Sequence, residues 1–215
     1  MESPIPNADL TFLRKEFLRD AKVIDLERGY ISASSFNLRM KPAILMAAGR
    51  LIAHALKDAR VDIIHGIPHS GNFLATAVAL AMDKETPTAG KQIRLHSSRK
   101  DQHVPATWKD IFRAETRSFT TSNSGMTIFS GINLSFVLPG DRVLLVDDVC
   151  ATGETGTRLV EGLLKRNVTV AGFAVLFDKV FQGGLEQVAR LGITVYSCIS
   201  VLEIGKHDLI TIAQP

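Results

Sequence analysis

Apolar and polar residues alternate along the chain in a pattern that predicts strands and helices following one another. Short apolar runs, most of them rich in β-branched residues, predict strands at 61–66, 92–97, 142–147, 168–178 and 193–202. Helices are predicted to begin near Asp9 and Pro42 and to occupy 72–82, 155–166 and 184–191. Because uninterrupted apolar strands are buried on both faces, this order indicates an α/β fold with a doubly wound, mainly parallel sheet covered by helices on both sides.

Two polar stretches interrupt this alternation. The serine-rich segment GYISASSFNL (29–38) predicts a turn or a short hairpin. Further along, ETRSFTT (115–121) and GMTIFSG (125–131) predict two exposed strands joined by a polar turn, which together form a second hairpin. We expect both hairpins to lie outside the parallel sheet.

Composition limits the classes of protein to consider. With 215 residues, 46% of them hydrophobic, the chain can bury the core of one sizeable domain. A net charge of +3 suits anionic small molecules and is too small to indicate nucleic-acid binding. The longest apolar run, 74–82, is far shorter than the ~20 residues of a membrane span. We therefore expect a cytoplasmic protein with no membrane or nucleic-acid partner, whose Cys150 and Cys198 are free thiols.

The loops after the predicted strands carry the chemistry. In parallel sheets, ligands bind beyond the carboxyl ends of the strands. Three loops should therefore share one crevice: GIPHSG (66–71), SSRKDQ (97–102) and DDVCATGET (147–155). The sequence predicts a ligand site at this edge of the sheet.

The third loop has the properties of a cradle for a phosphorylated sugar. The candidate phosphate ligands are Ala151, Thr152, Gly153, Glu154 and Thr155. They lead into a helix N-terminus, where free N–H groups and the helix dipole favour a phosphate. Asp147 and Asp148 would repel that phosphate, so they are better suited to accept hydrogen bonds from sugar hydroxyls or to face Mg2+. A ribose 5-phosphate meets both demands.

The stretch VLLVDDVCATGET (143–155) resembles the signature of the type I phosphoribosyltransferases, and the resemblance covers roughly residues 28–204. It implies that Asp147 and Asp148 contact the ribose hydroxyls of phosphoribosyl pyrophosphate (PRPP), and that residues 151–155 bind its 5-phosphate. It further implies transfer of ribose 5-phosphate to a nucleobase with release of pyrophosphate, in the presence of Mg2+.

The resemblance extends to the other two loops. GIPHSGNF (66–73) is similar to the family's pyrophosphate loop, which implies that His69, Ser70 and Gly71 face the leaving group. Arg99 and Lys100 resemble the basic pair that reaches the pyrophosphate of a neighbouring subunit, which implies a homodimer. The expected organisation follows the family: an N-terminal helix and hood segment (1–40), a core (41–204) with a flexible loop at about 98–125, and a C-terminal strand or tail (205–215).

The carboxyl-terminal half is most similar to the xanthine and other purine enzymes of the family. This similarity rests on RAETRSFTTSNSG (113–125) and LFDKVFQGGLEQVARLGITVYS (176–197), and it implies that Lys179 and Phe181 line the base pocket. A lysine ammonium donates to the exocyclic oxygens of a 6-oxopurine such as xanthine, hypoxanthine or guanine, and an aromatic ring stacks on the base. The lysine ammonium cannot accept a hydrogen bond from the amino group of adenine, which argues against that base.

Other parts of the sequence leave the base open. SASSFNLRMKP (32–42) resembles a hood segment of the xanthine enzymes, which places Asn37 over the base, but GYISASSFN also resembles orotate phosphoribosyltransferases. Glu154 adds a negative charge to the phosphate loop. The loop GIPHSG lacks the acidic residues that commonly precede the corresponding loop in xanthine and adenine enzymes. The alternatives are therefore an orotate enzyme of pyrimidine synthesis and a non-catalytic PRPP-sensing regulator. The residues before 28 are too few for the DNA-binding domain of such a regulator, so an enzyme is expected.

Overall fold

The computed structural model describes residues 7–85, 93–97, 100–101, 113–118, 128–134 and 137–214. Its helices are α1 (Asn7–Asp20), α2 (Ser34–Asn37), α3 (Pro42–Ala55), α4 (Gly71–Glu85), α5 (Glu154–Leu164) and α6 (Gly184–Ala189), together with the 3-10 turn η1 (Val180–Gln182). Its strands are β1 (Lys22–Asp25), β2 (Tyr30–Ser32), β3 (Ile63–Gly66), β4 (Arg94–Ser97), β5 (Lys100–Asp101), β6 (Arg113–Ser118), β7 (Ile128–Asn133), β8 (Arg142–Cys150), β9 (Thr169–Lys179), β10 (Val195–Ile204) and β11 (Ile210–Ile212).

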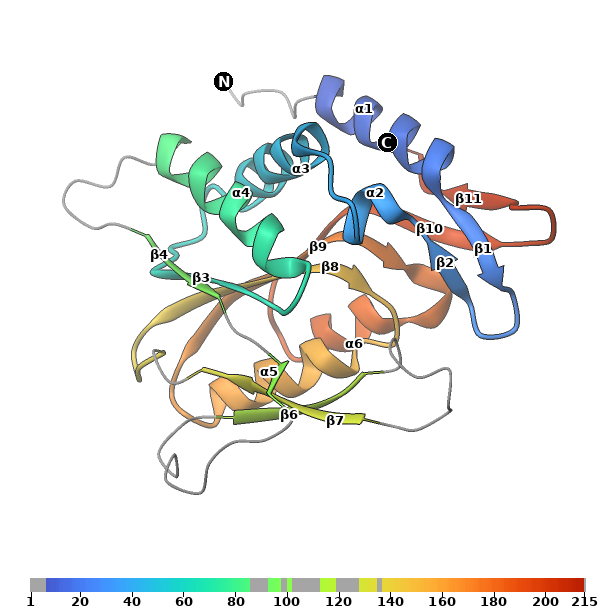
Figure 1. Ribbon diagram of the computed structural model, residues 1–215. Coiled ribbons are helices and arrows are strands. Elements are labelled where there is room, and N and C mark those ends of the chain that lie inside the picture. The colour runs from blue at the N-terminus through green and yellow to red at the C-terminus, as the bar shows by residue number, and fades with distance from the viewer. Residues whose placement is uncertain are drawn as a thin grey trace.

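The central sheet has the strand order β11-β10-β9-β8-β3-β4 within the described residues. All neighbours are parallel except β11, which runs antiparallel to β10. Helices α1, α3 and α4 lie on one face of the sheet, and α5 and α6 lie on the other (Figure 1). The predicted doubly wound, mainly parallel sheet is therefore confirmed. The chain reverses its direction of winding between β3 and β8, and ligands bind at such a switch point in open α/β sheets.

Each face of the sheet has its own hydrophobic core, and β8 contributes to both. Leu144 and Val146 pack under α3 and α4, whereas Val143 and Leu145 pack against α5. All four side chains are fully buried. The uninterrupted apolar sequence of β8 follows from this burial on both faces, which is typical of a central parallel strand.

The N-terminal hood combines α1, α2 and a small antiparallel hairpin. Strand β2 pairs with β1, with Val23 opposite Ile31. The predicted position of this hairpin was wrong: its first strand lies before residue 29, and residues 34–37 form the one-turn helix α2 instead of a second strand. Strand β1 was missed because its four side chains are exposed or only half-buried and its two apolar residues are adjacent, so apolar and polar residues do not alternate along it.

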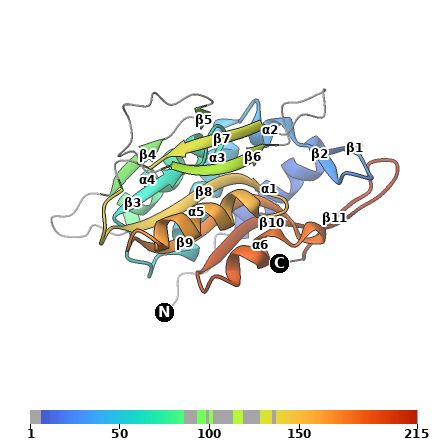
Figure 2. The same ribbon diagram turned by 90° about the horizontal axis from the view of Figure 1, so that it is seen from below.

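The second predicted hairpin is confirmed, with shifted ends. Strands β6 and β7 pair antiparallel, with Thr116 opposite Ser130, and β5 joins the far edge of β7. This small sheet lies beyond α5, on the side of the central sheet away from α3 and α4 (Figures 1 and 2). Most of the predicted flexible loop at 98–125 falls outside the described residues.

Two further observations concern the whole described chain. No helix within it is long and apolar enough to cross a membrane. Cys150 and Cys198 are both buried free thiols, as predicted.

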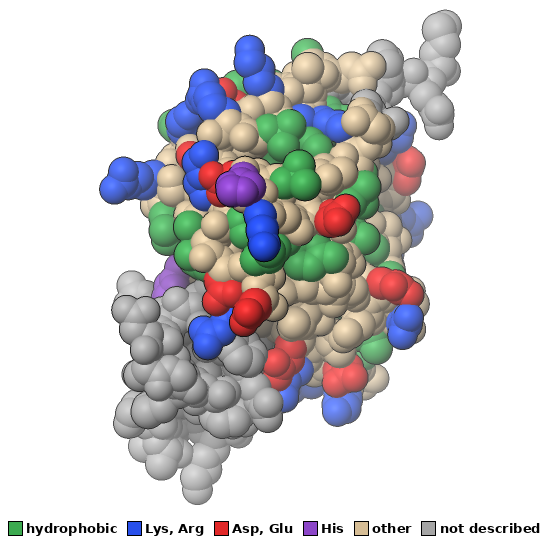
Figure 3. All heavy atoms as spheres, turned by 90° about the vertical axis from the view of Figure 1, so that its right-hand side faces the viewer, with side chains coloured by type: hydrophobic (Ala, Val, Ile, Leu, Met, Phe, Trp, Pro, Cys, Tyr) green, Lys and Arg blue, Asp and Glu red, His purple; other side chains and the backbone are tan. Residues whose placement is uncertain are grey.

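Figure 3 views the side of the molecule on which hairpins β1–β2 and β10–β11 lie. Exposed apolar side chains are interspersed there with charged ones (Figure 3), and Lys22 pairs with Asp208 across the two hairpins at 3.3 Å.

Candidate functional site

The paired acids Asp147 and Asp148 lie near the C-terminal end of β8. The sequence predicted that this strand would end at Asp147, but pairing with β9 continues to Cys150, which lies opposite Asp178. Asp147 and Asp148 are both half-buried, and the Asp148 N–H donates to the Asp147 carboxylate at 2.9 Å.

The predicted phosphate loop (151–155) leads into the N-terminus of α5, as its sequence predicted. Gly153 is the N-cap residue and adopts a left-handed conformation with φ of 77°, which favours glycine. Gly153 has no side chain, so the N-cap residue itself makes no side-chain hydrogen bond to the first N–H groups of the helix. Helix N-termini of this kind bind anions through those N–H groups and the positive end of the dipole.

The start of α6 supports this loop from behind, which sequence reasoning missed. The Gly184 N–H donates to the Ala151 carbonyl at 3.1 Å. A Cβ on Gly153 would lie 2.3 Å from the Gly184 carbonyl oxygen, and a Cβ on Gly184 would lie 2.2 Å from the Ala151 carbonyl oxygen. The two backbones therefore pack so closely that neither position has room for a side chain. The adjacent glycines Gly183 and Gly184 were the sequence feature that could have indicated this close backbone packing.

Glu154 does not present an uncompensated charge to the loop. Its carboxylate pairs with the Arg158 guanidinium one turn along α5, at 3.0 Å. Thr155 is half-buried beside it, and Thr152 is exposed at the tip of the loop. The negative charge that the sequence adds at Glu154 is thus balanced on the helix, while its backbone N–H remains part of the N-terminus.

The loop after β3 lies directly beside the acids. The Ile67 N–H donates to the Val146 carbonyl at 2.8 Å, and a Cβ on Gly71 would lie 3.1 Å from Oδ1 of Asp147. His69 is exposed, and the peptide bond between Pro68 and His69 is cis. The structure therefore brings the predicted pyrophosphate loop and the predicted ribose-binding acids together at the switch point of the sheet.

Lys179 ends β9 and faces the hood. Its side chain is buried, and its Nζ donates to the Gly29 carbonyl at 2.9 Å and lies 5.7 Å from the centre of the Tyr30 ring. Burial lowers the pKa of the Lys179 ammonium. Phe181, with 39% of its surface exposed, is also beside the hood turn, since a Cβ on Gly29 would lie 2.8 Å from its ring. The two predicted base-pocket residues thus lie together under the hood.

Gln182 adds a second link between this loop and the hood. Its Nε2 donates to the Arg28 carbonyl at 3.2 Å, and its Oε1 is buried without a hydrogen-bond partner among the described residues. Asn37, which the sequence placed over the base, also has a buried Oδ1 without a partner there. Its backbone carbonyl accepts a hydrogen bond from Ser70 Oγ at 2.8 Å. The hood therefore contacts both the base-pocket residues and the loop after β3.

Two buried ionisable residues, Cys150 of β8 and Asp178 of β9, lie opposite each other in the pairing of these strands. Burial, reinforced by the nearby Asp147 and Asp178, raises the pKa of the Cys150 thiol to about 12. Burial also raises the pKa of Asp178, although the Ser200 and Ser197 hydroxyls oppose that shift. Because the thiolate is the reactive form of cysteine, Cys150 is an inert core residue and not a nucleophile.

The remaining predicted residues are placed only in part. Arg99 lies outside the described residues. Lys100 begins β5, where its backbone lies opposite Ile132. Within the described ranges, no group of three or more His, Cys, Asp or Glu side chains could hold a metal ion.

The sheet order, with the acid pair and the glycine-capped loop at its switch point, defines an α/β protein with a candidate ligand site at the carboxyl ends of its strands. Residues 35–188 match the model of the phosphoribosyl transferase domain family, which is more than half of the chain, so the protein belongs to that family. It is an enzyme of the type I phosphoribosyltransferase class, which transfers the phosphoribosyl group of PRPP to a nucleobase, as the sequence predicted.

Individual relatives agree with this assignment. The chain is 28% identical over 173 residues to a xanthine phosphoribosyltransferase of Exiguobacterium, covering 80% of this chain and 83% of the relative. It is also 28% identical over 190 residues to a xanthine phosphoribosyltransferase of Lactiplantibacillus plantarum, covering 88% and 90%. Among solved structures, the adenine phosphoribosyltransferase of Rhodothermus marinus has a TM-score of 0.65 at 17% identity, covering 91% of this chain and 99% of that one. At this identity the structural likeness concerns the fold alone.

Proposed function

We propose that this enzyme transfers the 5-phosphoribosyl group of PRPP to a 6-oxopurine, with xanthine as the first candidate and hypoxanthine and guanine as close ones. The observation that carries the proposal is the position of Lys179, a buried cation next to Phe181 and under the hood. One of its three N–H groups is bonded to Gly29, which leaves donors for the exocyclic oxygens of an oxopurine. The relatives named xanthine phosphoribosyltransferases support the same base.

The PRPP end of the proposed site follows the strand and loop geometry. The N–H groups at 153–155 and the Thr152 and Thr155 hydroxyls would bind the 5-phosphate, and Asp147 and Asp148 would accept hydrogen bonds from the ribose hydroxyls. His69, Ser70 and Gly71 would face the pyrophosphate, because their loop touches Asp147. Arg99 and Lys100 are proposed to reach the pyrophosphate of the partner in a homodimer.

Mg2+ fits the proposed site. Proteins commonly hold this ion through one or two carboxylates together with substrate phosphates, and two adjacent carboxylates stand at the end of β8. Asp147 and Asp148 would therefore hold it with PRPP, and the ion would neutralise charge on the pyrophosphate leaving group.

The chemical step is a displacement at C1 of the ribose. A ring nitrogen of the base forms a bond to C1 as the bond from C1 to the pyrophosphate oxygen breaks, and the proton of the ring nitrogen leaves to solvent or a nearby base. The transition state resembles an oxocarbenium ion, so positioning and charge stabilisation supply the catalysis.

The base assignment is tested by measuring pyrophosphate release from PRPP and Mg2+ with xanthine, hypoxanthine, guanine, adenine and orotate in parallel, for the wild type and Lys179→Ala. We expect a 6-oxopurine to be the preferred base. Loss of one hydrogen bond from a charged donor should lower kcat/KM for that base by roughly 10- to 150-fold. Lys165→Ala, an exposed lysine after α5, is the matched control and should keep full activity. Preference for adenine or orotate, or full activity of Lys179→Ala, would overturn the assignment.

A further inference from the structure

The one-turn helix α2 is held in place by residues far from it in sequence. It spans four residues, and its N-cap residue, Ala33, has no side-chain oxygen to satisfy the first N–H groups. A single turn is not stable by itself because nucleation fixes several residues for one hydrogen bond. Packing of Phe36, which is fully buried and meets the Phe17 ring edge-on at 5.3 Å, fixes one side of α2. Its N-terminus requires another partner.

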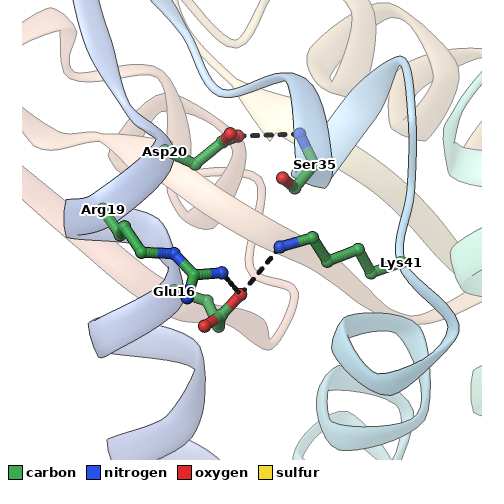
Figure 4. A network of polar contacts seen from close by, with 5 residues as sticks. All are labelled: Glu16, Arg19, Asp20, Ser35 and Lys41. Carbon is green, nitrogen blue, oxygen red and sulfur yellow. Dashed lines mark hydrogen bonds and ion pairs between the residues drawn. The ribbon is translucent and has the colours of Figure 1, made fainter.

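Asp20, the last residue of α1, supplies that partner. Its Oδ2 accepts a hydrogen bond from the Ser35 backbone N–H at 2.7 Å (Figure 4). A carboxylate at this position satisfies a free N–H group and lies at the positive end of the helix dipole. The Asp20 side chain thus does for α2 what an N-cap side chain within the helix normally does.

Glu16 holds the segment after α2 to the same face of α1. Only 8% of its surface is exposed, and its carboxylate accepts hydrogen bonds from Arg19 and from Lys41 Nζ, the latter at 3.0 Å (Figure 4). Lys41 immediately precedes α3 and is its N-cap residue. The chain from Ser35 to Lys41 is therefore attached to α1 near both of its ends.

The opposite end of α2 contacts the proposed active site. The Asn37 carbonyl accepts a hydrogen bond from Ser70 Oγ at 2.8 Å, and the Asn37 side chain carries a buried Oδ1 with no partner in the described part of the chain. The base side and the pyrophosphate side of the site therefore meet at one residue. Any displacement of α2 would move Asn37 and remove the acceptor that holds Ser70.

We propose that Asp20, assisted by Glu16, is a positioning residue: it fixes α2 so that Asn37 and the pyrophosphate loop are placed together for the two substrates. Its effect on turnover rests on the proposed function, whereas its effect on α2 does not. Asp20 touches no reacting atom, so its removal should act on substrate binding through Asn37 and Ser70.

The structural half of the proposal is tested by hydrogen exchange in Asp20→Ala, Asp20→Asn and Asp9→Ala. Asp9 is the matched control, because its carboxylate joins α1 to Arg50 of α3 at 2.6 and 2.7 Å without touching α2. We expect Asp20→Ala to lower amide protection in 34–41 and in 66–73 by about tenfold, the effect of one lost cap. Asp20→Asn keeps an acceptor oxygen and should retain most of the protection. Loosening of 34–41 alone, or equal loosening in Asp9→Ala, would contradict the coupling.

The kinetic half uses the same variants and the double variant with Ser70→Ala. Asp20→Ala should raise KM for both the base and PRPP by about tenfold with a smaller change in kcat, and Asp20→Asn should restore both. Because Ser70 contacts the base side of the site only through the Asn37 carbonyl, Ser70→Ala should add little to the effect of Asp20→Ala on KM for the base. Additive effects on KM for the base, or a fall in kcat alone, would overturn the proposal. If no base were turned over by the wild type, the proposed function would fail, and the exchange results would still decide the role of Asp20.

Discussion

A buried histidine, His65, beside the half-buried His96 should make the stability of this enzyme depend on pH. His65 of β3 and His96 of β4 lie opposite each other in the parallel pairing, with 2.8 Å between their Nδ1 atoms. His65 has no exposed surface. Burial and the neighbouring His96 lower the pKa of His65 to about 3, and burial lowers the pKa of His96 as well. Both rings are therefore neutral in the folded enzyme at pH 7.

The sign and size of the effect follow from linkage. Below pH 6.5 the unfolded chain takes up a proton on His65 that the folded protein refuses down to about pH 3. Protonation therefore favours unfolding, and stability is lost as the pH falls through this window. The loss approaches about 1.4 kcal/mol per pH unit, which gives about 2 kcal/mol from His65 between pH 7 and pH 5.

Urea unfolding of the wild type and of His65→Gln, each at pH 7 and pH 5, measures this contribution. Carboxylates and the other histidines contribute to both proteins, so the difference between the two pH dependences isolates the contribution of His65. We expect the wild type to lose about 2 kcal/mol more than His65→Gln over this interval. His207→Asn, at an exposed position in the turn between β10 and β11, should behave as the wild type. Equal pH dependence of wild type and His65→Gln would show that burial does not keep His65 neutral in the folded protein.

Three further substitutions test the site and the hood. Gly153→Ala places a Cβ 2.3 Å from the Gly184 carbonyl oxygen, at a residue with left-handed backbone conformation. It should lower the affinity for PRPP, measured by calorimetry, at least about tenfold. Unchanged affinity would contradict a role of this loop in binding the 5-phosphate. Gly29→Ala adds a Cβ 2.7 Å from Gln182 Nε2 at a residue with φ of 65°, so it should displace the hood and raise KM for the base. An unaltered KM would argue against a role of the contact between the hood and Gln182 in base binding. Phe36→Ala should lower the free energy of unfolding by about 3–5 kcal/mol in urea, and a loss below 1 would mean that the ring is not a core residue.

Much of the fold could be predicted because its signals are local. The apolar run of β8 is buried on both faces, and the loop after it carries a glycine where the left-handed N-cap of α5 requires one. Both facts depend on residues close together in the sequence. The three loops that the sequence assigned to one edge could be grouped because parallel strands end at the same edge of a sheet.

The contacts that complete the site could not be predicted in this way. Lys179 bonds to the carbonyl of Gly29, 150 residues away, and such a contact leaves no periodic pattern in the sequence. Gly184 supports the phosphate loop through backbone packing, which a glycine count does not reveal. The short strand β1 lacks a buried face, so hydrophobic alternation could not detect it.

We propose above all that this protein forms a nucleotide from PRPP and a 6-oxopurine. The most direct test is to mix the enzyme with PRPP, Mg2+ and xanthine and to quantify the nucleotide and the pyrophosphate formed. We predict that both appear in a one-to-one ratio, and that Asp147→Asn with Asp148→Asn abolishes both. A rise in melting temperature with PRPP but no nucleotide from xanthine, hypoxanthine, guanine, adenine or orotate would contradict this activity and indicate a PRPP sensor.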